Sequence, residues 1–286
     1  MSDSLLNISG KIDSVTVALY ESVSAAAEEL DIPFVVVGAS ARDIVLHYGY
    51  GALIQRATTD ADFGIEVSGW SAFEALKEIL LEKGFTDTRA QHRLISSGNV
   101  PVDIVPFGQI EDENSNIQWT NSEMNVLGFQ DVCDSAEIVR IQDEPPVDIP
   151  VATPAGMAVL KLIAWTDREA DMRGKDAKDL LYLFTTYEKI PAVSDDLFED
   201  QSLMERYDWE LSLASAHQLG IDAELIVENQ TYDVIANFFE DRHEHLSVER
   251  LIEEMCERIE HEYESNEELT MAFINGFLRK QDEDDE

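Results

Sequence analysis

The chain has 286 residues, 44% of them hydrophobic, which is enough for one large domain or two ordinary ones with a sizeable core. Its 59 acidic residues outnumber 20 basic ones, and the net charge of −39 argues against broad binding to duplex nucleic acid or to an anionic membrane. Two distant cysteines argue against a disulfide framework or a zinc site, and without a signal-like start or a long apolar run we expect a cytoplasmic protein with no membrane span.

The first half of the chain mixes helical and strand patterns. Helical spacing of apolar residues predicts helices over 12–30 and 71–83, and a shorter one from Ser40, as N-cap, to about Tyr48. Apolar or alternating runs predict strands at 34–37, 60–67, 93–96, 102–107, 137–141 and 147–151. Loops are expected at 49–59 and 111–116, where glycine or acidic and asparagine residues gather.

From Thr153 onward, helical periodicity dominates. We expect helices at 154–167, 175–187, 208–219, 222–240, 247–264 and 267–279. The pattern predicts an α+β protein with a mixed sheet and flanking helices in residues 1–152, a helical domain in 153–280, and a disordered acidic tail in 281–286.

Three aspartates on two predicted strands resist a purely structural explanation. Asp60 and Asp62 are two residues apart, so a strand points both to one face, where they repel each other unless a cation intervenes. Asp103 lies among apolar residues of another strand, where an unpaired carboxylate would be costly to bury. An oxygen-rich site of this kind suits Mg²⁺. The alternative is a turn or a solvated strand end.

A glycine turn precedes the aspartates. Gly38 follows a buried strand and Ser40 opens a helix, so backbone N–H groups and the helix dipole would face an anion there. Gly38 would permit close approach of a phosphate, and the Ser40 hydroxyl could add a hydrogen bond. The alternative is an ordinary tight turn with a helix cap.

Several charged residues outside these motifs are candidates for the same site. Lys161 lies in an otherwise apolar helical stretch of a lysine-poor chain, which suggests a phosphate contact, although a lysine at a helix edge is the alternative. Arg56 and Arg93 could be cations near the site or members of surface ion pairs. Asp176 and Asp179 could brace Lys161 or Arg168 across two packed helices or lie on a solvated helix face.

Four blocks, at 36–43, 56–63, 102–108 and 160–180, together resemble the DNA polymerase beta-type nucleotidyltransferase superfamily. They are most similar to predicted nucleotidyltransferases grouped with AbiEii/AbiGii toxin-like proteins. The resemblance covers about residues 34–187 and leaves the rest of the chain without support. One departure is Ala39, which stands where relatives usually have glycine or serine.

The resemblance implies roles for individual residues. Asp60 and Asp62 would bind two Mg²⁺ ions and the nucleotide phosphates, and Asp103 would help to activate the attacking hydroxyl. Gly38 and Ser40 would form the triphosphate-binding turn, Lys161 would contact the triphosphate, and Asp176 matches an acidic residue of a later motif. Arg42 and Arg56, which lie in the first two blocks, complete the candidate nucleotide-binding set.

The implied activity is transfer of a nucleoside monophosphate from an NTP to an acceptor hydroxyl, with release of pyrophosphate. The acceptor stays open between the 3′ end of tRNA, as toxin-like relatives suggest, a small molecule, as in antibiotic-modifying relatives, and a protein side chain. A cognate antitoxin is a further partner that the resemblance raises. The rival interpretation is a non-catalytic NTP-binding or partner-binding module.

Overall fold

The computed structural model describes residues 5–54, 60–243, 245–256 and 259–278. The chain divides into two compact units, Met1–Thr153 and Pro154–Glu286, which are described separately. The predicted acidic tail at 281–286 lies outside the described residues. In the part of the chain that is described, no helix is both long enough and apolar enough to cross a membrane.

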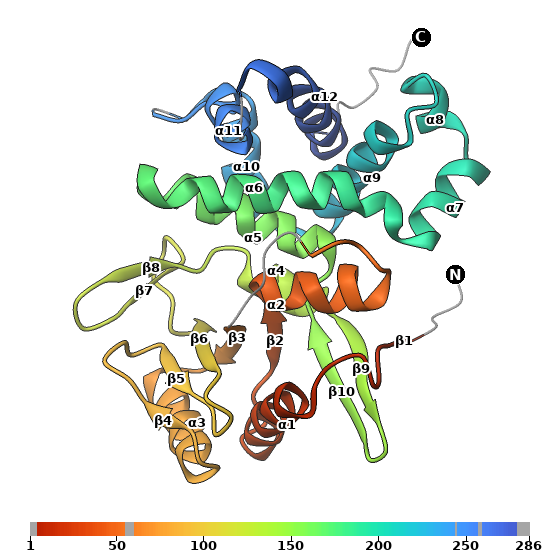
Figure 1. The fold of residues 1–286 in the computed structure, drawn as a ribbon. Coiled ribbons are helices and arrows are strands. Elements are labelled where there is room, and N and C mark those ends of the chain that lie inside the picture. The colour runs from red at the N-terminus through yellow and green to blue at the C-terminus, as the bar shows by residue number, and fades with distance from the viewer. Residues whose placement is uncertain (1–4, 55–59, 244, 257–258, 279–286) are drawn as a thin grey trace. The chain divides into compact units, whose positions relative to one another are not determined.

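The first unit contains a mixed sheet of eight strands, in the order β1-β9-β10-β2-β3-β6-β5-β4 (Figure 1). At its centre β3 runs antiparallel to β2 and parallel to β6, and β5 pairs antiparallel with the other edge of β6. A separate hairpin joins β7 and β8. The bounds are β1 Leu6–Asn7, β2 Phe34–Val37, β3 Ala61–Val67, β4 Thr86–Asp87, β5 Arg93–Ile95, β6 Pro101–Gly108, β7 Asn116–Gln118, β8 Glu123–Asn125, β9 Glu137–Asp143 and β10 Pro146–Val151.

Helices pack on both faces of the central strands. Phe63 of β3 contacts Tyr20 of α1 (Ser14–Glu29) on one face. The next residue, Gly64, faces the opposite side, where a Cβ would come within 2.7 Å of Phe129 in α4 (Phe129–Asp134). Helix α3 (Trp70–Glu82) packs against α1 and β3. This double cover explains why β3 carries an almost continuous run of buried residues.

The connection after β2 is tighter than the sequence suggested. Helix α2 (Gly38–Arg42) begins directly at the end of β2, with Val37 in the cap position, and continues as a π-helical segment, η1 (Asp43–Gly49). The prediction of Ser40 as the N-cap was therefore wrong. Gly38 adopts a φ of +67°, a left-handed conformation that turns the chain into the helix directly after Val37, the extended last residue of β2.

The long predicted elements of the first unit are confirmed, each ending within a few residues of its prediction. The elements that were not predicted are short: β1, β4, α4 and the β7–β8 hairpin. Strands of two or three residues contain too little alternation to produce a pattern. For the same reason, the loop predicted at 111–116 ends inside β7.

The second unit is helical. Its elements are α5 Pro154–Asp167, α6 Ala170–Thr186, η2 Tyr187–Lys189, α7 Pro191–Glu199, α8 Ser202–Arg206, α9 Leu211–Ile226, α10 Asn229–Phe239, α11 Val248–Met255 and α12 Ile259–Phe277. Helices α9 and α12 approach closely at two glycines. A Cβ at Gly220 would lie 2.1 Å from the carbonyl oxygen of Phe273, and a Cβ at Gly276 would lie 2.0 Å from the carbonyl oxygen of His217, so only residues without a side chain allow this approach.

Helix boundaries in this unit differ from the predictions in several places. Helix α9 runs through the break predicted after residue 219, and α11 ends at Met255 rather than near residue 264. Helix α6 begins at Ala170 rather than near residue 175, because its first turn is charged and carries no apolar period. Helices α7 and α8 occupy a segment where no helix was predicted. Helix α12 continues through the break predicted at 265–266. The polar Asn266 interrupts the apolar pattern there, but its side chain is buried within the helix.

Candidate active site

Cross-strand register brings the predicted carboxylates together. Asp62 of β3 lies opposite Asp103 of β6, and Asp103 lies opposite Arg93 of β5, so the three form one row on one face of the sheet. Asp60 comes just before β3 and has the same parity as Asp62. One carboxylate oxygen from each of Asp60, Asp62 and Asp103 lies within 4.8 Å of the other two. Among the residues described, no other group of His, Cys, Asp or Glu side chains shares this spacing.

The chemistry of this cluster fits a divalent cation. Its donors are all carboxylate oxygens, which Mg²⁺ prefers. All three side chains are only partly buried, so a ligand can reach them. Mutual repulsion among three carboxylates at this spacing favours a cation between them.

The glycine turn lies directly against Asp62. Val37, the last residue of β2, pairs with Asp62 across the sheet, and a Cβ at position 38 would come within 2.3 Å of the Asp62 Oδ2 atom. Only glycine fits there, both because of this contact and because of the positive φ. The turn and the carboxylate are thus one structural unit.

Ser40 is placed beneath the turn. Its side chain is buried, and its hydroxyl donates to the carbonyl oxygen of Val37 at 3.1 Å and faces the backbone N–H of Asp62 at 3.5 Å. The Tyr20 hydroxyl also bonds to Ser40; burial raises the pKa of Tyr20, and this hydrogen bond opposes the rise. Ser40 therefore links α1, the turn and β3.

Two arginines, Arg42 and Arg56, belong to the predicted nucleotide-binding set. Arg42 is buried, and its Nε and Nη2 atoms lie 3.1 and 2.9 Å from the Oδ1 atom of Asp43. This pair lies where α2 passes into η1. Arg56 lies outside the described residues.

Arg93 lies beside the three carboxylates, although the sequence left it open between a cation near the site and a member of a surface ion pair. Its Nε and Nη2 atoms donate to the two oxygens of Asp103 at 2.6 and 2.5 Å, and Nη2 lies 3.7 Å from Asp60 Oδ2. The hydrogen bond to Asp103 raises the pKa of Arg93, so the guanidinium stays charged. The signal that could have found this pair is the short β5–β6 connection, which places residue 93 opposite residue 103.

Lys161 and Asp176 meet within the helical unit. The Lys161 ammonium lies 2.9 Å from Asp176 and 2.7 Å from Asp179, and Arg168 donates to the second oxygen of Asp176 at 2.6 Å. Asp176 is fully buried. Burial disfavours the charged form of Lys161, but the two aspartates outweigh it and raise its pKa. Asp176 and Asp179 thus brace Lys161 across α5 and α6.

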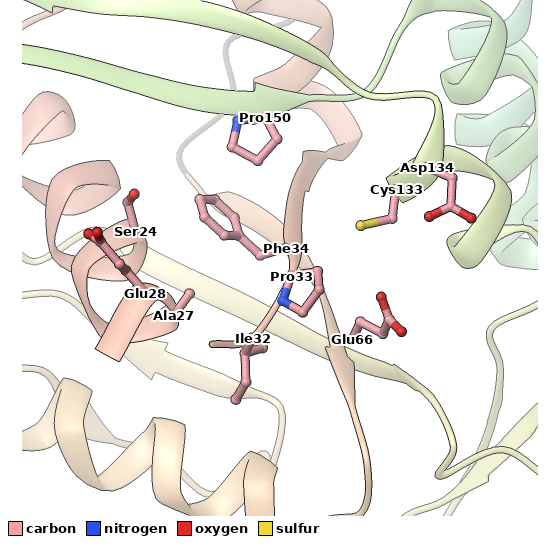
Figure 2. Close-up of a pocket in the computed structure, with 10 residues that line it drawn as sticks. All are labelled: Ser24, Ala27, Glu28, Ile32, Pro33, Phe34, Glu66, Cys133, Asp134 and Pro150. Atoms are coloured by element: carbon pink, nitrogen blue, oxygen red, sulfur yellow. The ribbon is translucent and has the colours of Figure 1, made fainter. Parts of the chain in front are cut away.

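A surface cavity of about 620 Å³ lies elsewhere in the first unit (Figure 2). It opens beside Phe34, at the end of the β2–β3 pair opposite to Asp62, and none of the clustered carboxylates lines it. Its wall includes Cys133, whose pKa is raised to about 12 by burial and by the nearby Glu66. The cavity is therefore separate from the acidic centre.

A mixed sheet that gathers three aspartates beside a glycine turn is the arrangement of a nucleotidyltransferase. The chain belongs to the AbiEii family: the model described as "Nucleotidyl transferase AbiEii toxin, Type IV TA system" matches residues 22–265. The chain is accordingly a nucleotidyltransferase. A comparison with curated proteins found no match.

Solved structures with similar chains include two kinds of nucleotidyltransferase. One is the antibiotic-resistance factor ANT(2″)-Ia, in complex with adenylyl-2″-tobramycin, at 15% identity and a TM-score of 0.38, covering 68% of this chain and 99% of that chain. Another is the Thermotoga maritima CCA-adding enzyme complexed with tRNA, at 11% identity and a TM-score of 0.27, covering 94% of this chain and 80% of that chain. With scores this low, the assignment rests on the family match and on the sheet itself.

Proposed function

We propose that this enzyme transfers a nucleoside monophosphate from an NTP to an acceptor hydroxyl, using Mg²⁺ held by Asp60, Asp62 and Asp103. The observation that carries the proposal is the convergence of these three carboxylates within 4.8 Å on one face of the sheet. In the reaction the acceptor oxygen forms a bond to the α-phosphorus, the bond from that phosphorus to the bridging oxygen breaks, and pyrophosphate leaves.

The carboxylates have different tasks in this scheme. Two bound Mg²⁺ ions would supply Lewis-acid chemistry, lowering the pKa of the acceptor hydroxyl and neutralising charge on the leaving group. Asp60, just before β3, and Asp62, within it, have the same parity and would hold the metal and the phosphates. Asp103 is on the neighbouring strand, where it would hold metal or accept the proton of the acceptor hydroxyl.

Phosphate positioning is assigned to two places. The turn at Gly38 would bring backbone N–H groups to the phosphates, while Ser40 and Arg42 would support it from below through their buried hydrogen bonds. Lys161 would contact the triphosphate, with Asp176 holding its ammonium. Arg56, a candidate cation of the sequence, is assigned to the same task.

We infer that the acceptor to test first is the 3′ hydroxyl of tRNA. The family description names a toxin, and a tRNA end can enter a narrow site without a wide basic surface, which a net charge of −39 disfavours. Such an enzyme would act in the cytoplasm, and a cognate antitoxin would be its partner. A small-molecule acceptor of the antibiotic type is the second candidate.

Labelled transfer tests the proposal. The purified chain would be incubated with each [α-³²P]NTP and Mg²⁺, in separate reactions with tRNA, aminoglycosides and protein extract. We expect one acceptor to become labelled, and labelling to disappear in the Asp60→Asn/Asp62→Asn double variant with the fold retained by circular dichroism. Labelling that persists in the double variant would remove the mechanism. Tight NTP binding without transfer to any acceptor would favour the non-catalytic module.

A further inference from the structure

Arg93 occupies both oxygens of the carboxylate that would be the third metal ligand. The guanidinium meets Asp103 in a two-pronged pair at 2.6 and 2.5 Å, and it also lies 3.7 Å from Asp60. It therefore reaches two of the three clustered carboxylates from the outer side of the row. Each donor takes one lone pair of an Asp103 oxygen, so a metal ion that binds this carboxylate either displaces a donor or uses a remaining lone pair beside the guanidinium charge.

The position of Arg93 is fixed by the sheet. Strands β5 and β6 place residue 93 directly opposite residue 103, and β6 and β3 place residue 103 opposite residue 62. Arg93 thus stands beside the cluster in the same row, with a side chain that is 39% exposed. That exposure leaves the guanidinium space to move away when Asp103 changes partner.

We propose that Arg93 is an internal competitor for the divalent cation: it neutralises Asp103 and screens Asp60 until metal binds, and so sets the metal affinity of the centre. This inference rests on the proposed metal site and adds a residue to it. Removing the guanidinium takes away both a rival for the Asp103 oxygens and a positive charge a few ångströms from the incoming cation. Metal affinity should therefore rise, at the expense of the stability of the metal-free protein.

A second arginine of the same sheet provides a matched control. Arg140 on β9 faces Asp148 on β10 in the same cross-strand relation, with donor distances of 2.8 and 2.9 Å and a side chain that is 31% exposed. This pair is separated from β6 by β2 and β3 in the strand order. Loss of Arg140 removes a comparable ion pair without removing a charge from the acidic cluster.

The test is Mn²⁺ binding, measured by electron paramagnetic resonance on the full chain without nucleotide. Binding that survives in Asp60→Asn/Asp62→Asn is subtracted, because a chain with 59 acidic residues also attracts Mn²⁺ at its surface. We expect Arg93→Gln to bind Mn²⁺ about tenfold more tightly than the native chain, and Arg140→Gln to stay within about twofold of it. Arg93→Lys, which keeps the charge but loses the two-pronged geometry, should fall between them.

Each outcome decides a separate point. Equal or weaker binding by Arg93→Gln would overturn the competition and leave the metal site standing. If neither the native chain nor Arg93→Gln binds Mn²⁺ beyond the double variant, the proposed metal site fails and the competition fails with it. If Arg93→Gln does not fold, Arg93→Lys decides alone, and affinity no higher than native would reject the proposal.

Discussion

Two charged clusters of the chain differ in charge balance and in burial. Among the described residues of the first unit, Asp60, Asp62 and Asp103 gather around Arg93, which pairs with Asp103 and lies 3.7 Å from Asp60. Among those of the second, Asp176 and Asp179 pair with Lys161, and Asp176 also pairs with Arg168. The first cluster has an excess of carboxylates and is partly exposed. The second is balanced in charge, and its central carboxylate, Asp176, is fully buried.

The difference indicates what each cluster is suited to do. A balanced, buried set of ion pairs satisfies its own charges, so its loss should cost stability. An excess of carboxylates at the edge of solvent is poorly matched to a structural role and well matched to a cation. We therefore expect changes in the first cluster to affect chemistry more than folding, and changes in the second to affect folding first.

The largest effect should come from Asp103→Asn. The variant keeps the size of the side chain but removes a charge that would hold metal or accept a proton, so nucleotide transfer should fall by about 10²- to 10⁴-fold. The free energy of unfolding should fall only slightly, because the Asp103–Arg93 pair is partly exposed to solvent. Transfer kinetics and urea unfolding measure the two quantities. A variant that loses much of its free energy of unfolding but keeps its specific activity would show that the cluster is structural rather than catalytic.

Asp176→Asn should show the opposite balance. It removes the carboxylate charge that Arg168 and Lys161 share at a fully buried position and leaves Lys161 with Asp179, so we expect a loss of about 3 kcal/mol in the free energy of unfolding. Asp148→Asn is the matched control, since its pair with Arg140 is exposed and should cost less than about 1 kcal/mol. Equal losses in the two variants, measured by urea unfolding, would contradict the structural role of Asp176.

Gly38→Ala links the two kinds of effect within the first cluster. The new Cβ would meet Asp62 Oδ2 at 2.3 Å in a left-handed backbone, so we expect a loss of about 1–3 kcal/mol in the free energy of unfolding. Weaker Mn²⁺ binding should accompany this loss, because Asp62 must shift. Gly51→Ala shares the positive φ but has open space around it, and should leave Mn²⁺ binding unchanged. Unchanged Mn²⁺ binding by Gly38→Ala would separate the turn from the site.

The smallest effect should be a pH dependence confined to the helical unit. Burial lowers the pKa of His217 to about 4, and its Nδ1 atom lies 2.8 Å from the Tyr207 hydroxyl. The pKa of His217 is lower in the folded chain than in the unfolded chain, so below about pH 6.5 the unfolded chain takes up the proton first. The stability that neutral His217 gives the fold is therefore complete above about pH 6.5 and declines as the pH falls towards 4. Between pH 6.5 and 5 the loss should be about 1–2 kcal/mol. His217→Gln should remove this slope in urea unfolding; an unchanged slope would show that His217 is not its source.

The sequence carried enough information for the acidic centre but not for its surroundings. Asp60, Asp62 and Asp103 could be found because strand alternation and apolar neighbours are local signals, and the parity of Asp60 and Asp62 follows from a period of two. The hydrogen bond of Ser40 beneath the turn comes from Tyr20, twenty residues earlier. No local pattern encodes that contact.

Long-range pairing limited the remaining predictions. The partner of Arg93 is set by the register of β5 and β6, and the complete burial of Asp176 by the packing of helices. Charged first turns, as in α6, and two-residue strands such as β4 carry no periodicity to detect. The missed features are therefore those in which tertiary contacts, rather than local spacing, determine the conformation.

The central claim is that Asp60, Asp62 and Asp103 bind divalent cations together with the nucleotide. Anomalous diffraction from crystals grown with Mn²⁺ and a non-hydrolysable NTP tests it directly. We predict anomalous density within coordination distance of all three carboxylates, with Asp103 turned from Arg93 to the metal. Bound nucleotide whose metal contacts none of the three, with Asp103 still paired to Arg93, would contradict it.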